Sequence, residues 1–238
     1  MVDGEGEQRY WDNGMTQMLA SVASFEEARL LIPFNIHILD LKDPSRGALG
    51  ALDTALVRQI VEAYPSQIIS ATVGDLPMDP DQIAEEVDAM AETGVDFIKI
   101  GFFAEHETWP KVLQRLHPII ERGYKLIAVL FADQPIDLDC LEAFDAAGFH
   151  GVMVDTADKA RGGLLAHRNS VWLNLFVRTA QDRGLLTGLA GSLAVHDIPE
   201  LKRIRSDYLG FRGALCSGGR TGRIDLEAVQ RIRETVIA

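Results

Sequence analysis

The segment ILDLKDPSRGALGALDTALVRQIVEAY, residues 38–64, contains the unit from which the whole chain is predicted to be built. The apolar run NIHIL (35–39) overlaps its start and predicts a buried strand, and DPSRGALG (43–50) predicts a turn. The apolar residues of DTALVRQIVEAY (53–64) recur with a period of about 3.6, which is typical of a helix lying on a sheet. The segment is therefore a strand, a turn and a helix, and it places Asp40 and Lys42 where the strand ends.

The same unit recurs along the chain. Strands are expected at 17–22, 35–41, 67–73, 96–102, 125–131, 150–156, 185–191 and 207–213, and helices at 25–32, 51–64, 80–93, 107–121, 137–147, 170–183, 197–205 and 225–236. Eight such units predict an α/β fold, a single-domain (β/α)8 or TIM barrel over residues 15–238. A doubly wound open sheet is the alternative, but no GxGxxG motif opens a helix after the first strand, which disfavours a dinucleotide-binding fold.

Composition limits where the protein works. The chain has 238 residues, of which 47% are hydrophobic, and no run of 18 apolar residues that would predict a membrane span. Residues 1–14 are polar and acidic, unlike a secretory signal, and are expected to form a flexible leader, with Met15 as an alternative start. Cys140 and Cys216 lie far apart in no metal-like spacing, so a reduced, cytoplasmic protein is expected.

Charge limits the partners. The formal net charge of −12 disfavours nucleic acid and anionic membranes as partners, and an anionic substrate would need positive charge gathered locally. Only six of the 23 basic residues are lysines, so lysines at special places suggest chemistry. The six histidines show no metal-binding spacing, and we expect neither a metal nor a cofactor.

Charged residues fall where the active site of a barrel is expected, at the C-terminal ends of the strands. Alternation along the strands puts Lys42, Lys99 and Asp155 on lumen-facing positions of the second, fourth and sixth strands. Side chains from alternate strands share a layer of the lumen, so these three are expected to meet, with Asp40 one layer deeper. Lys159 follows in the loop after the sixth strand.

Crowded lysines suggest a particular chemistry. Burial and a neighbouring cation both lower the pKa of a lysine, and a neutral amine can attack a carbonyl to form a Schiff base. A nearby carboxylate can then move protons. A lone Asp–Lys pair at a strand end is more often a salt bridge, but several acid–base positions in one layer favour catalysis, because buried charge is costly.

Glycine-rich loops follow the seventh and eighth strands, where barrels often bind phosphate through main-chain N–H groups. The predicted phosphate-binding residues are Gly191, Ser192, Arg212, Gly213, Gly218 and Gly219. Arg220 and Arg223 are further candidates for positive charge in the same loop. The alternative is a flexible loop that leads into a helix starting at Asp225.

Six motifs in order carry a family resemblance: DLKDPSRGALGA (40–51), SATVGD (70–75), DFIKIG (96–101), MVDTADK (153–159), GLAGSL (188–193) and GFRGALCSGGRTGRID (210–225). Together they resemble (5-formylfuran-3-yl)methyl phosphate synthase, also called 4-(hydroxymethyl)-2-furancarboxaldehyde-phosphate synthase, of methanofuran biosynthesis. The resemblance runs from about Met15 to the C-terminus.

The resemblance implies a barrel lyase that condenses two molecules of glyceraldehyde 3-phosphate into a phosphorylated furan aldehyde, with loss of phosphate and water. The family's Schiff-base lysine falls on Lys42 and its neighbouring acid on Asp40. Two further site lysines fall on Lys99 and Lys159, and the second acid on Asp155. The product would serve the biosynthesis of a methanofuran-type one-carbon carrier.

Other functions remain open at this point. A class I aldolase-like barrel acting on other triose or sugar phosphates would use the same lysine chemistry. A non-catalytic barrel that binds a phosphorylated metabolite would bind its ligand without turnover. In each case the expected partner is a small phosphorylated molecule, and a homo-oligomer is expected because barrels with apolar helix faces commonly associate.

Overall fold

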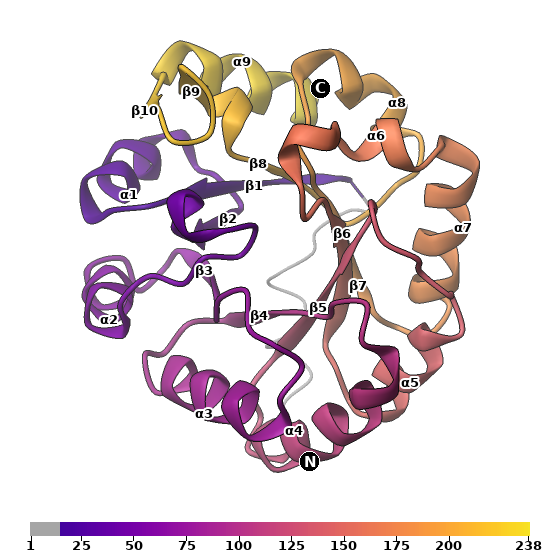
Figure 1. The fold of residues 1–238 in the computed structure, drawn as a ribbon. Helices are drawn as coiled ribbons and strands as arrows, with labels where there is room; N and C mark the ends of the chain where they lie inside the picture. The colour runs from indigo at the N-terminus through magenta and orange to yellow at the C-terminus, as the bar shows by residue number, and fades with distance from the viewer. Residues whose placement is uncertain (1–14) are drawn as a thin grey trace.

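The computed structural model describes residues 15–238 and contains a closed barrel of eight parallel strands in the order β1 to β8 (Figure 1). The strands are β1 (Gln17–Val22), β2 (Ile38–Leu41), β3 (Ile68–Thr72), β4 (Phe97–Gly101), β5 (Leu126–Phe131), β6 (Gly151–Asp155), β7 (Leu186–Leu189) and β8 (Tyr208–Phe211). The predicted (β/α)8 barrel is therefore confirmed. The predicted leader, residues 1–14, lies outside the described residues.

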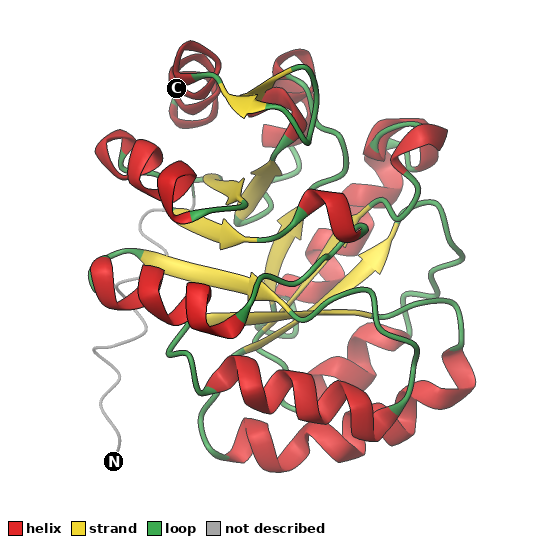
Figure 2. Cartoon of the chain, turned by 60° about the vertical axis from the view of Figure 1, so that its left-hand side comes forward, coloured by secondary structure: helices red, strands yellow, loops and turns green. Residues whose placement is uncertain are grey.

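Helices surround the barrel (Figures 1 and 2). They are α1 (Phe25–Leu31), α2 (Thr54–Ala63), α3 (Pro80–Ala91), α4 (Trp109–Glu121), α5 (Cys140–Ala146), α6 (Leu164–His167), α7 (Ser170–Gln181), α8 (Ile198–Lys202) and α9 (Leu226–Ile237). Aspartate side chains cap several of these helices: Asp79 accepts hydrogen bonds from the first-turn N–H groups of α3, and Asp225 does so for α9. No helix within residues 15–238 is long and apolar enough to cross a membrane.

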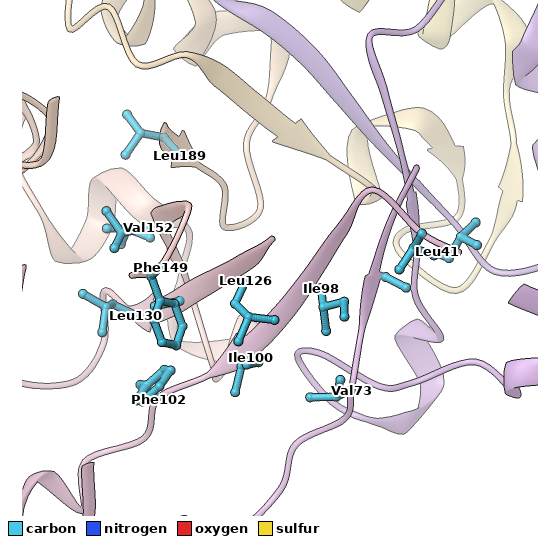
Figure 3. Close-up of a cluster of buried hydrophobic side chains, with 14 of the residues drawn as sticks. Leu41, Val73, Ile98, Ile100, Phe102, Leu126, Leu130, Phe149, Val152 and Leu189 are labelled. Carbon is cyan, nitrogen blue, oxygen red and sulfur yellow. The ribbon is translucent and has the colours of Figure 1, made fainter. Parts of the chain in front are cut away.

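Strand alternation divides the core into two layers. The outer layer packs between the barrel and the helices, and it includes Ile98 and Ile100 of β4 (Figure 3). The inner cluster fills the lumen and includes Phe97 of β4, Met153 of β6 and Tyr208 of β8. Lys99 shares the lumen-facing side of β4 with Phe97, so it is one of the few charged residues buried inside the barrel.

The structure differs from the sequence-based prediction by more than one residue at an edge of β2, β7 and β8, and β7 ends at Leu189 instead of 191. Strand β2 begins at Ile38 instead of 35, because Ile32–Phe34 forms a 3-10 turn that ends on Asn35 in the left-handed region, with φ of 49°. Strand β8 ends at Phe211, and the loop after it contains a small hairpin of Cys216–Ser217 and Arg223–Ile224. The short helix α6 was not predicted either. All these differences lie in connections, where local hydrogen bonding decides the backbone path.

Removing the Phe102 ring is expected to test the outer core. The ring lies edge-on against Trp109, Phe144 and Phe149, with ring centres 5.3, 4.8 and 5.8 Å away, and so joins β4 to α4 and α5. Phe102→Ala should lower the free energy of unfolding by about 3–5 kcal/mol, measured by urea denaturation. Val171→Ala, at a side chain that is 78% exposed, should change it by less than about 0.5 kcal/mol. Equal effects in the two variants would contradict this view of the core.

Candidate active site

A cavity of about 370 Å³ opens among the C-terminal ends of the strands and the loops that follow them. It is lined by all five of the residues that were predicted to be catalytic: Asp40, Lys42, Lys99, Asp155 and Lys159. The strands β2, β4 and β6 supply Asp40, Lys99 and Asp155, Lys42 follows β2 directly, and Lys159 lies in the loop after β6. The sequence therefore predicted correctly that these side chains lie together, while their catalytic roles stay predictions.

Asp40 and Lys99 form a buried ion pair at the deep end of the site. The Lys99 ammonium lies 2.7 Å from Asp40 Oδ1, and the two side chains are 2% and 0% exposed. Ser70 donates a hydrogen bond to the same oxygen, and Ser21 donates one to Oδ2. Burial alone would raise the pKa of Asp40, but Lys99 and Lys42 outweigh it and hold that pKa below its ordinary value.

Asp155 is the second buried carboxylate, and two lysines share it. Lys42 Nζ lies 3.7 Å from Asp155 Oδ2, and the Lys159 ammonium binds Oδ1 while also donating to Thr156 Oγ1 at 2.8 Å. Burial would raise the pKa of Asp155, but the charges of Lys159 and Lys42 lower it well below its ordinary range. Burial lowers the pKa of Lys159, although the charge of Asp155 opposes this effect.

Lys99 was expected in one layer with Lys42 and Asp155, and the structure refines that expectation. The five groups divide into the pair Asp40–Lys99 and the trio of Lys42, Asp155 and Lys159. Lys99 lies beside Thr72 in the strand register, and its ammonium pairs with Asp40, which lies beside Ser21 and Ser70. Burial lowers the pKa of Lys99, with a further contribution from the charge of Lys42.

The loops that carry the site are held by two carboxylates outside the cavity. Asp75, after β3, accepts hydrogen bonds of 2.7 Å from the main-chain N–H groups of Ala48 and Leu49 in the loop after β2. Asp133, after β5, accepts hydrogen bonds from the N–H groups of Ala157 and Asp158 in the loop after β6. Each loop is therefore fixed by an acid of a neighbouring strand end.

These two loops repeat one sequence pattern. Residues 40–49 read DLKDPSRGAL and residues 155–164 read DTADKARGGL, with the same residue at the first, fourth, seventh, eighth and tenth places. Each copy starts with the aspartate that lines the cavity and folds into a 3-10 turn, Pro44–Arg46 or Lys159–Arg161. In each copy the fourth residue, an aspartate, caps the start of the turn. The eighth residue, a glycine, ends the turn with φ of 115°, which only glycine adopts readily. Strands β2 and β6 are four apart in the closed barrel, so the copies lie on opposite sides of it.

The predicted phosphate-binding glycines lie mostly at the cavity. Gly191, Ser192, Gly213 and Gly219 line it, whereas Gly218 is exposed in the hairpin turn and does not. The main-chain N–H groups of Gly191, Ser192 and Gly213 donate to no acceptor within the described part of the chain. Ser192 also takes a left-handed backbone conformation, with φ of 51°, that is uncommon for a residue with a side chain. Free N–H groups at a cavity wall are suited to an anion.

Arg212 was predicted to contact phosphate, but in the structure its side chain contacts only protein atoms. The guanidinium forms a two-pronged ion pair with Glu27, at 2.5 and 3.1 Å, and donates to the main-chain oxygens of Ser21, Arg220 and Gly222. All of its donors are therefore directed at protein atoms and its charge is neutralised. We correct the expectation accordingly: Arg212 holds β8 and its loop to β1 and α1.

Ser21, Ser70 and Thr156 were missed as site residues. All three are buried, and their hydroxyl groups contact the charged side chains of the site. A signal was present in the sequence, because Ser21 and Ser70 interrupt otherwise apolar or small-residue strands at lumen-facing positions. A buried hydroxyl needs a polar partner, so its presence inside a barrel indicates a neighbouring charge or polar group.

Comparison with known proteins gives consistent results. The sequence profile of the 4-HFC-P synthase family matches residues 18–233. The (5-formylfuran-3-yl)methyl phosphate synthase of Methanocaldococcus jannaschii is 34% identical over 91% of this chain and 98% of its own length. A Methylorubrum extorquens protein that carries the same name provisionally is 38% identical over 84% of this chain and 82% of its own. The crystal structure of 3-hexulose-6-phosphate synthase from Salmonella typhimurium has a TM-score of 0.66 at 13% identity, covers 93% of this chain and 99% of that one, and shares the fold.

Breaking the Asp40–Lys99 pair is expected to destabilise the barrel. Asp40→Asn leaves a buried ammonium without its carboxylate, and the free energy of unfolding should fall by about 3 kcal/mol or more in urea denaturation. The double variant Asp40→Asn with Lys99→Met should recover part of that loss, because it removes the unpaired charge. Asp81→Asn breaks an exposed pair with Arg115 and should have little effect. Additive losses in the double variant would contradict the pairing.

Stability is expected to fall in acid. The folded-state pKa values of Asp40 and Asp155 both lie below the ordinary value of about 3.9. Their ionised forms therefore stabilise the fold above about pH 4, and this contribution is lost as the pH falls below that value. Urea denaturation at pH 7, 5, 4 and 3 should show it as a decline below pH 4 that is shallower in Asp155→Asn. The same decline in the variant and the wild type would remove Asp155 as a cause.

Proposed function

The chain belongs to the 4-HFC-P synthase family, and we propose that it condenses two molecules of glyceraldehyde 3-phosphate into (5-formylfuran-3-yl)methyl phosphate. One observation carries the proposal: the Lys42 amine lies in a cavity with a carboxylate, two further lysines and an excess of positive charge. That arrangement combines a candidate nucleophile, proton-transfer groups and an environment for phosphate. The names of the relatives support this particular product, and the substrate and the route to it are our proposal.

The charge of the cavity supports a phosphorylated substrate. Five basic side chains and two acidic ones line the cavity, and Glu27 neutralises one of the basic groups, Arg212. The excess cations lie in a chain whose net charge is −12, so they are concentrated where a small anion would bind. The free N–H groups of Gly191, Ser192 and Gly213 would add hydrogen bonds to phosphate oxygens.

The first step of the proposed reaction uses Lys42. Its amine, after giving up a proton, adds to the carbonyl carbon of one triose phosphate, and loss of water gives an imine. Asp155, 3.7 Å from this amine, would accept and return the protons of that exchange, with Lys159 on its other oxygen. Asp40 is less suited to this task, because both of its oxygens already accept hydrogen bonds from Ser21, Ser70 or Lys99.

The later steps form the ring. The imine draws electrons from the neighbouring carbon, which loses a proton and becomes an enamine that attacks the aldehyde of the second triose phosphate. Phosphate leaves by elimination beside the imine, and ring closure with dehydration gives the aromatic furan. Water then hydrolyses the imine, which releases the furan aldehyde and returns Lys42 as the free amine. Mass balance from two triose phosphates to one furan phosphate requires loss of one phosphate and two waters. Lys99 and Lys159 would stabilise negative charge or protonate departing oxygens.

The proposed setting is the biosynthesis of a methanofuran-type one-carbon carrier in the cytoplasm. Both cysteines are free thiols, which agrees with a reducing compartment. The proposed catalysis is that of a lyase and assigns no step to a cofactor. The association of the chain into a homo-oligomer stays a prediction.

Replacing the nucleophile is expected to abolish both covalent trapping and turnover. The wild-type protein, incubated with glyceraldehyde 3-phosphate and then borohydride, should carry a reduced adduct on Lys42, identified by peptide mass spectrometry. Lys42→Arg keeps the charge but removes the nucleophile, so it should lose the adduct and about 1000-fold or more in turnover, followed by furan absorbance. Lys202→Arg, on α8 away from the cavity, is the matched control.

The same assay separates the alternatives. Furan absorbance together with free phosphate is the result expected of the synthase. A condensed product that keeps both phosphates would identify a class I aldolase-like enzyme instead. Ligand binding with neither product nor adduct would identify a non-catalytic binding barrel. Near-normal turnover in Lys42→Arg would remove the Schiff base from the mechanism.

A further inference from the structure

Two arginines line the cavity, and they differ in what their guanidinium groups contact. Arg212 is neutralised by Glu27 and has every donor directed at a protein atom. Arg220, eight residues later in the same loop, donates only through Nη2, to the main-chain oxygens of Pro44 and Gly47, the latter at 2.9 Å. Neither carbonyl carries a formal charge, and no carboxylate within residues 15–238 forms an ion pair with Arg220.

The remaining donors of Arg220 are available to a ligand. Its Nε and Nη1 groups donate to no acceptor within the described residues, and Arg220 is partly buried at the cavity wall. A guanidinium presents its N–H groups in a rigid plane that matches two oxygens of a phosphate. The bonds to Pro44 and Gly47 hold the group in place, which reduces the entropy lost when it binds a ligand.

The position of Arg220 connects it to the reacting groups. Its charge reaches Lys159, because it contributes to the lowered pKa of that lysine. Its partners Pro44 and Gly47 lie in the turn that follows Lys42, so the guanidinium spans from the loop after β8 to the loop after β2. An anion bound to Arg220 would lie at the cavity wall, between the glycine-rich loop and the loop that follows Lys42.

We propose that Arg220, and not Arg212, is the guanidinium that binds a phosphate group of the substrate. The inference rests on the proposed function in one respect: it takes the substrate to be phosphorylated. It adds the residue that recognises that group, and Gly213 and Gly219 of the same loop also line the cavity. Arg212 keeps a structural role through Glu27.

The test compares the binding of inorganic phosphate by wild type, Arg220→Gln, Arg220→Lys and Arg223→Gln. Arg223 is exposed in the same hairpin, so its variant is the matched control. Isothermal titration calorimetry should give a dissociation constant about 10- to 100-fold weaker for Arg220→Gln, an intermediate loss for Arg220→Lys and less than about a twofold change for Arg223→Gln. Phosphate binding by Arg220→Gln that equals wild type would overturn the proposal.

A second measurement separates ligand binding from loop stability. Loss of the bonds to Pro44 and Gly47 can lower the melting temperature of Arg220→Gln by itself. The rise in melting temperature that added phosphate produces depends only on binding, and it should be present in Arg223→Gln and greatly reduced in Arg220→Gln. An equal rise in both variants would show that Arg220 serves only to hold the loops.

Kinetics then show which proposal fails if one of them does. With glyceraldehyde 3-phosphate as substrate, Arg220→Gln should raise KM more than it lowers kcat. Phosphate binding through Arg220 without any furan product would support this inference and contradict the proposed function. Furan formation with an unchanged KM in Arg220→Gln would support the proposed function and contradict this inference.

Discussion

Two carboxylates and three lysines inside one barrel impose the constraint on which the rest of the site depends. An ionised group loses its hydration when it is buried, so each of these charges needs a partner within a few ångströms. Asp40 meets that need with Lys99 and two serine hydroxyls, and Asp155 meets it with Lys159 and Lys42. The result is a neutral pair, Asp40 with Lys99, and a trio that has one more lysine than carboxylate, and the two groups differ in exposure and freedom.

The difference between the two groups indicates a division of labour. Asp40 has both oxygens occupied and lies wholly inside the barrel, which makes it suited to fixing the position and charge of Lys99. Asp155 holds Lys42 at the longer distance of 3.7 Å, and Lys159 approaches it from a loop instead of a strand. Asp155 Oδ2 is therefore the carboxylate oxygen that remains free to exchange protons with a bound substrate in the proposed reaction.

The loops around the cavity combine rigid and open parts. Asp75 and Asp133 fix the two loops that repeat one sequence pattern, and Arg212 fixes the loop after β8 through Glu27. The N–H groups of Gly191 and Gly213, which also line the cavity, have no acceptor within the described residues. For the proposed phosphorylated substrate, such fixed loops would reduce the conformational entropy that is lost on binding.

The sequence by itself determined the barrel and the identity of the central residues. Alternation with period two places Asp40, Lys42, Lys99 and Asp155 on lumen-facing positions, and the strand–helix repeat leaves a closed parallel barrel as the favoured fold. It did not determine which lysine joins which acid, because that depends on strand register and on how far a flexible side chain reaches across the lumen.

Only the tertiary structure separated the two arginines of the last loop and brought Ser21 and Ser70 to Asp40. Glu27, which neutralises Arg212, lies 185 residues from it in sequence. Pro44, whose main-chain oxygen accepts a hydrogen bond from Arg220, lies 176 residues from that arginine. No local pattern encodes contacts across such separations. They follow from the closure of the barrel, which brings β1 beside β8 and decides which charged groups remain free to meet a ligand.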